Sequence, residues 1–266
     1  MGACGAIGVA LVIVGVGTYS FWHIERRASP RPHRPRQTAV LAARSSSTKP
    51  FSRFSFLASK SNKKTTPTPS VVTAGQAHQV KATIFWTGEE ATADNGYIAN
   101  SPSAWDEHWK DHFGGYDDPN HRNGFLPQAF TPKENPFYFA LPYSDFTNAG
   151  VRRATAAQCS AITGNNNPSY SWCKNAWIMV RYGDRTVYAQ WEDVGPYEED
   201  DTAYVFGTAA PRNSFGTHAG LDVSPAVRDY LKIPDVATVT WQFVAANSVP
   251  AGPWTQTITT NPGDKF

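Results

Sequence analysis

Short runs of alternating apolar and polar residues, separated by Gly, Pro, Asn and Asp, fill the chain from Lys81 onward. A period of two is typical of strands that bury one face. The pattern predicts five strands, at 81–86, 137–141, 176–182, 186–191 and 238–244. The third and fourth lie in WIMVRYGDRTVYAQW, which predicts a β-hairpin with its turn at residues 182–185.

One amphipathic helix is predicted in the segment DVSPAVRDYLKI. Ser224 can cap its N-terminus, and Pro225 suits the first helical position. The apolar face of this helix is formed by Ala226, Val227, Tyr230 and Leu231. Pro234 then ends the helix.

The segment 95–130 is rich in aromatic residues but has no long periodic pattern, as in AWDEHWKDHFGGYDDPNHRNGF. Residues 105–112 are compatible with a short helix that ends at Gly114. Loops of this length in compact domains are usually functional or disordered, and the aromatic content argues against disorder. We therefore expect a mainly β domain with one short helix and a long aromatic loop insertion.

The N-terminal segment is apolar: residues 3–22, ACGAIGVALVIVGVGTYSFW, carry no charge and are numerous enough to span a bilayer. No Lys or Arg precedes them, and no Ala-x-Ala cleavage site follows. Residues 1–26 are therefore predicted to be a membrane anchor or an uncleaved signal. The positive-inside rule would keep the arginines that follow, and hence the domain, in the cytoplasm. The cysteine pair and the family resemblance described below favour export to the cell envelope, either anchored or secreted.

Charge divides the chain into two parts. Residues 1–80 hold eleven of the 24 Lys/Arg and one of the 22 acids, so they carry +10 and the remainder carries −8. Residues 27–79 are rich in Ser, Thr, Pro and basic residues, and are predicted to be a disordered linker. An acidic domain is a poor partner for nucleic acid, because phosphate contacts require Lys and Arg. A membrane contact through the N-terminal segment is expected instead.

The chain has three cysteines. Cys4 precedes the apolar segment, whereas Cys159 and Cys173 flank a short loop rich in turn-forming residues. In an oxidising compartment the latter two would form a disulfide, and in a reducing one they would be buried thiols.

Two motifs carry the candidate chemistry. The first is EDVGPY at 192–197, and the second is LDVS at 221–224, directly before the predicted helix. Together with the opening KATIFW at 81–86, they resemble the rare lipoprotein A (RlpA-like) family, whose fold is shared by expansins and family-45-type endoglucanases. Val194 stands where that family has Arg, and the family's His has no counterpart in FYFALPYSDF. The resemblance implies a six-stranded double-psi β-barrel over residues 80–256, followed by a C-terminal tail at 257–266.

The resemblance also implies chemistry on cell-wall polysaccharide. Cleaving a glycosidic bond requires an acid that protonates the leaving oxygen, and Asp193 matches the family's catalytic Asp. Asp222 matches the acid of the second motif and either supports the site or caps the helix. Glu192 should point away from the site, because neighbouring strand residues face opposite sides.

Aromatic rings can bind the apolar face of a sugar, and the candidates are Trp86, Trp105, Trp109, Tyr116 and Tyr197. No metal or other cofactor is expected, although His108 and His112 have a spacing that would place both on one helix face. The predicted function is single-acid, lytic transglycosylase-like cleavage of peptidoglycan. The alternatives are a non-catalytic, expansin-like module that binds polysaccharide or loosens the wall, and a structural or protein-interaction barrel.

Overall fold

The computed structural model describes residues 76–266, and the predictions for residues 1–75 lie outside this part of the chain. Its elements in chain order are β1 (His78–Ile84), α1 (Trp109–Phe113), β2 (Arg122–Asn123), β3 (Leu126–Pro127), β4 (Tyr138–Leu141), α2 (Ala157–Thr163), β5 (Trp177–Tyr182), β6 (Arg185–Val194), α3 (Thr202–Val205), β7 (Leu221–Val223), α4 (Pro225–Leu231) and β8 (Val236–Val244). Short 3-10 helices occupy Ala154–Ala156, Ala246–Ser248 and Pro253–Thr255. Within residues 76–266, every helix is too short or too polar to cross a lipid bilayer.

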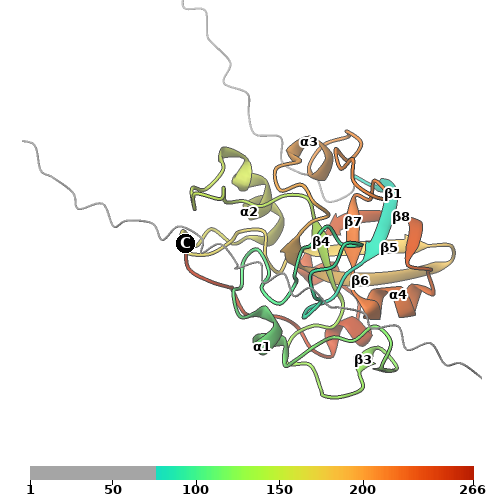
Figure 1. The fold of residues 1–266 in the computed structure, drawn as a ribbon. Helices are drawn as coiled ribbons and strands as arrows, with labels where there is room; N and C mark the ends of the chain where they lie inside the picture. The colour runs from blue at the N-terminus through green and yellow to red at the C-terminus, as the bar shows by residue number, and fades with distance from the viewer. Residues whose placement is uncertain (1–75) are drawn as a thin grey trace, which may run out of the picture. The chain divides into compact units, whose positions relative to one another are not determined.

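Six strands form a closed barrel in the order β1-β7-β4-β6-β5-β8 (Figure 1). Two neighbouring pairs, β1 with β7 and β4 with β6, are parallel, and the others are antiparallel. Each of the five predicted strands is confirmed, with β1 beginning at His78 and β6 extending to Val194. The barrel strand missed in the sequence is β7, which is only three residues long, and the two-residue strands β2 and β3 outside the barrel were also not predicted.

The predicted hairpin and helix are also confirmed. Strands β5 and β6 pair from Trp177 opposite Gln190 to Tyr182 opposite Arg185. Helix α4 begins after Ser224, whose hydroxyl accepts a hydrogen bond from the Val227 amide at 3.3 Å. The possible short helix before Gly114 is present as α1, whereas α2 and α3 were not expected, because they are short turns in segments without a clear apolar period.

The aromatic insertion packs against the barrel. Helix α1 lies in it and ends at Gly114, whose φ of 112° suits a residue without a side chain. The fully buried Trp109 and Phe113 of α1 pack on Tyr138 of β4, with ring centroids at 5.2 and 5.8 Å. The insertion is thus an ordered extension of the fold (Figure 1).

The C-terminal residues 257–266, expected to be a tail, also belong to the domain. The Gln190 amide donates a hydrogen bond to the Thr259 carbonyl at 3.0 Å, and the Phe266 ring stacks on Phe146 at 3.9 Å. Thr259 is buried. The last residues therefore cover one side of the barrel.

A disulfide joins Cys159 of α2 to Cys173, with their Cα atoms 4.7 Å apart. Both residues are fully buried in the main hydrophobic core. The predicted pairing is confirmed, and it indicates an oxidising environment outside the cytoplasm. Under the loop-entropy account, closing a loop of this length stabilises a fold by about 3 kcal/mol.

Candidate functional site

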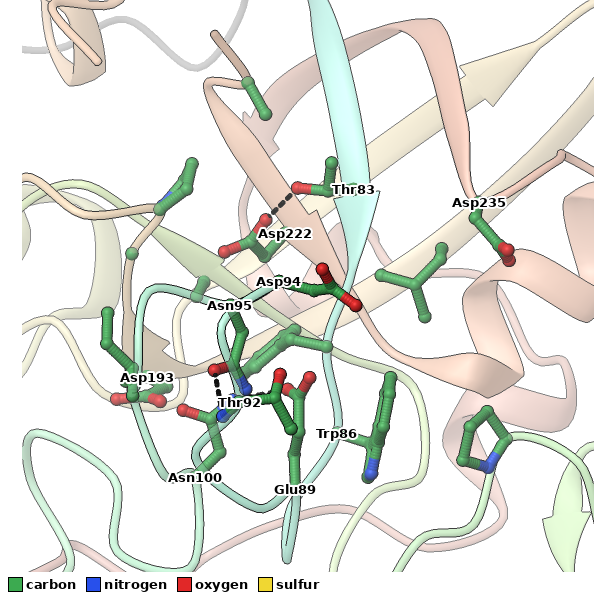
Figure 2. Close-up of a pocket in the computed structure, with 18 of the residues that line it drawn as sticks. Thr83, Trp86, Glu89, Thr92, Asp94, Asn95, Asn100, Asp193, Asp222 and Asp235 are labelled. Atoms are coloured by element: carbon green, nitrogen blue, oxygen red, sulfur yellow. Dashed lines mark hydrogen bonds between the residues drawn. The ribbon is translucent and has the colours of Figure 1, made fainter. Parts of the chain in front are cut away.

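A groove of about 1050 Å³ opens where β1, β6 and β7 end. Its floor carries Asp193 from β6 and Asp222 from β7, and its walls come from the segment that follows β1 (Figure 2). Because β1 and β7 are parallel, Thr83 lies directly beside Asp222, and the chain beyond both strands continues at the same rim. The two motifs identified in the sequence therefore meet at one site.

Asp193 lies at the end of β6, opposite Ala140 and next to an irregularity in the pairing with β4. Its Oδ1 accepts hydrogen bonds from the Ala104 amide at 2.7 Å and the Val194 amide at 2.8 Å. The residue is only 6% exposed, and it forms part of the groove lining. Burial raises the pKa of Asp193 to about 7, although the two amide hydrogen bonds act in the opposite direction.

Asp222 is less enclosed and lies on the central residue of β7. The Thr83 hydroxyl donates a hydrogen bond to its Oδ1. Burial, with smaller contributions from the negative charges of Glu89 and Asp193, raises the pKa of Asp222 to about 7, although the Thr83 hydrogen bond acts in the opposite direction. The carboxyl is therefore protonated in a large fraction of molecules near neutral pH.

Gly195 permits a close approach at this rim. A Cβ atom at this position would lie 3.3 Å from Asp222 Oδ2, which is tighter than ordinary van der Waals contact. The Gly195–Pro196 turn then places Tyr197 at the groove edge, where its ring lies 4.5 Å from that of Phe215. The Gly-Pro dipeptide of the first motif thus brings an aromatic wall next to the acids.

Glu89 is a third carboxyl of the groove; it is buried like Asp193 and was missed in the sequence. Its Oε2 accepts a hydrogen bond from the Asn100 side chain at 2.7 Å. Burial raises the pKa of Glu89, and hydrogen bonds to it partly offset this effect. The sequence shows that Glu89 follows the first predicted strand. It does not show that β1 and β7 end at the same rim, which is what brings Glu89 close to the acids of the two motifs.

Three of the five predicted aromatic contacts lie in the groove, namely Trp86, Tyr116 and Tyr197. Tyr116 and Tyr197 are each 42% exposed, so their rings are open to a ligand. The prediction was wrong for Trp105 and Trp109, which are 1% and 0% exposed. Both fill the space between the insertion and the barrel, where Trp105 packs on Trp191 at 5.6 Å.

Glu192 faces away from the groove, as the alternation of β6 predicts. It forms a buried ion pair with Lys174, and both side chains are 1% exposed. Burial raises the pKa of Glu192 to about 7, while the Lys174 charge opposes this rise. Glu192 is thus part of the structural interior and is separate from the candidate site.

Two histidines of the insertion, His112 and His121, each pair with a different acid. The His112 Nδ1 atom lies 2.7 Å from Asp106 Oδ2, and the His121 Nδ1 atom lies 2.7 Å from Asp118 Oδ2. Asp117 accepts the Tyr138 hydroxyl at 2.8 Å. Within the part of the chain that the structure describes, no three His, Cys, Asp or Glu side chains are grouped as metal ligands.

Comparison with known proteins gives little further information. No family model matches the chain, and no curated protein matches it. Among solved structures, the Streptomyces papain inhibitor aligns with 64% of this chain and 96% of its own, at 17% identity and a TM-score of 0.28. This likeness is too weak to support a fold family or a function.

Proposed function

We propose that the protein binds a cell-wall glycan in the groove and cleaves it by acid catalysis at Asp222 and Asp193. The observation that carries the proposal is the pair of enclosed carboxyls, each with a pKa near 7, on the floor of a groove with exposed tyrosine walls. Acids of raised pKa in a concave site are typical of catalytic groups. The barrel is proposed to have the double-psi topology of RlpA-like proteins and to act in the cell envelope, tethered or secreted through the N-terminal segment.

The hydrogen bonds favour a division of roles between the two acids. Two backbone amides donate to Asp193, which favours its ionised form. Asp222 accepts only one hydroxyl, and although this hydrogen bond also favours the ionised form, the nearby charges of Glu89 and Asp193 favour the neutral form. We therefore assign the proton donor to Asp222 and the stabilising carboxylate to Asp193. This assignment reverses the expectation from the sequence, which gave the acid role to Asp193.

Cleavage would require two proton transfers at Asp222. Asp222 gives its proton to the glycosidic oxygen, the bond from that oxygen to the anomeric carbon breaks, and positive charge develops on the sugar ring. The Asp193 carboxylate stabilises this charge. A hydroxyl of the same sugar then attacks the anomeric carbon, and its proton passes to the Asp222 carboxylate. The products are an anhydro-sugar end and a free hydroxyl end, as in a lytic transglycosylase.

The test is product analysis. The full chain is incubated with purified peptidoglycan sacculi, and the soluble fragments are analysed by mass spectrometry. Anhydro-muropeptides are expected from the parent protein and from the control Asp184→Asn, which alters an exposed turn residue away from the groove. Reducing ends in place of anhydro ends would show that water, and not a sugar hydroxyl, attacks. Absence of any soluble fragment would reject cleavage.

A second candidate is binding without cleavage, as in expansins. It is favoured by the enclosure of Asp193, which leaves it 6% exposed, together with the open faces of Tyr116 and Tyr197. Such a module would sediment with insoluble glycan and release no fragments. Tyr197→Ala would then weaken sedimentation, whereas Asp222→Asn would leave it unchanged.

A further inference from the structure

The groove has a strongly acidic lining. Its carboxyl side chains are Glu89, Glu90, Asp94, Asp193, Asp222 and Asp235. The basic residues of the lining are Lys110 and Arg228, and the Arg228 guanidinium forms ion pairs with Asp229 at 2.9 Å and with the groove acid Asp235 at 3.7 Å. Acids thus outnumber bases on this surface. A neutral sugar polymer carries no positive charge that could pair with this excess.

The acids are distributed along the groove. In Figure 2, Asp193 and Asp235 lie at opposite sides of the view, with Asp222 and Asp94 between them. They come from four separate parts of the chain: the segment after β1, the end of β6, strand β7 and the residue directly before β8. An extended ligand could contact several of these acids, and positive charges on it would pair with those that are ionised.

The groove also contains groups suited to a cationic sugar in particular. Asp193 is nine-tenths buried, and its Oδ1 takes both amide hydrogen bonds, so its Oδ2 is left to the groove. The exposed faces of Tyr116 and Tyr197 suit both the apolar face of a pyranose and a neighbouring ammonium group. The combination of spaced carboxylates and aromatic faces fits a polymer of amino sugars.

We infer that the preferred ligand of the groove is a glycan with free amino groups, such as a de-N-acetylated stretch of an amino-sugar polymer. This inference rests on the proposed glycan-binding function and specifies its substrate class. Each protonated amine would meet one carboxylate, with Glu90 and Asp94 at the open wall and Asp193 at the floor. An N-acetylated sugar would leave these acids without a partner.

The test compares oligomers of glucosamine and of N-acetylglucosamine, matched in length, by titration calorimetry with the full chain. At low salt and slightly acid pH, we expect the glucosamine oligomer to bind about tenfold more tightly, given two or three partly exposed ion pairs. Added salt should reduce this ratio, because it screens exposed charges. The double variant Glu90→Gln/Asp94→Asn should lower the ratio several-fold.

A matched control removes two acids outside the groove, in the double variant Glu107→Gln/Asp184→Asn, and should leave the ratio unchanged. Equal binding of the two oligomers would overturn this inference and leave the proposed function intact. A polylysine peptide of the same charge that binds as tightly as the glucosamine oligomer, and displaces it, would also overturn the inference. Such a result would show that the groove attracts any polycation. If neither oligomer binds and no soluble fragments are released from sacculi, the proposed function itself would be rejected.

Discussion

The substitution Asp222→Asn should stabilise the protein at neutral and alkaline pH. Folding raises the pKa of this carboxyl from 3.8 to about 7. Each tenfold change in proton affinity corresponds to about 1.4 kcal/mol, so the ionised form costs the folded state roughly 4 kcal/mol at most. Solvent reaches part of the side chain, and Asn lacks one acceptor, so we expect a gain of about 2 kcal/mol.

The dependence on pH follows from the direction of the shift. Between about pH 4 and pH 7, the folded protein holds a proton on Asp222 that the unfolded chain has released. The parent therefore loses stability as pH rises through this window, and the loss is complete above pH 7. The variant has no ionisable group at position 222 and therefore lacks this pH-dependent loss. The difference in unfolding free energy between variant and parent should be near zero below about pH 4, increase between pH 4 and pH 7, and stay constant above pH 7.

The assay is urea unfolding followed by tryptophan fluorescence, at several pH values, with the disulfide intact. Asn at position 222 can still accept the Thr83 hydroxyl, so the local packing is retained. The control Asp184→Asn should change the unfolding free energy by no more than about 0.5 kcal/mol at any pH. An Asp222→Asn protein that is less stable than the parent at pH 8, or equally shifted at all pH values, would refute the reasoning.

The remaining predictions concern catalysis, binding and the core. Cleavage of sacculi should fall as pH rises above about 7, because Asp222 loses the proton it donates; a rate that keeps rising to pH 9 would contradict this. Tyr197→Ala should weaken glycan binding several-fold in sedimentation while leaving the melting temperature nearly unchanged. Trp109→Ala should instead lower the unfolding free energy by about 3–5 kcal/mol, because it empties a fully buried site; a melt like that of the parent would contradict its core role. Reduction of the Cys159–Cys173 disulfide should destabilise the domain by about 3 kcal/mol, measured by unfolding with and without reductant.

The alternation and capping residues along the sequence were sufficient to predict the β5–β6 hairpin and helix α4, because both form from residues that are neighbours in the chain. The strands of the β5–β6 hairpin alternate clearly, and their turn residues lie between them. Helix α4 has its capping Ser224 and Pro225 in adjacent positions. Strand β7 escaped prediction because three residues are too few to display a period, and its existence depends on β1 and β4 on either side.

The site was predictable only in part, for a related reason. Asp193 and Asp222 lie in motifs that can be read along the chain, whereas Glu89 joins them only because β1 runs parallel to β7. Trp105 and Trp109 occur in the same aromatic segment as Tyr116, and composition cannot distinguish a ring that fills the core from one that faces the groove. That distinction depends on how the insertion packs against Tyr138 and Trp191.

The most direct measurement is the rate at which the full chain releases soluble fragments from sacculi near pH 6, compared between the parent and Asp222→Asn. If Asp222 supplies the proton, the variant should be slower by about 100-fold or more while still sedimenting with the glycan. Equal rates for the two proteins would show that the groove acid takes no part in cleavage.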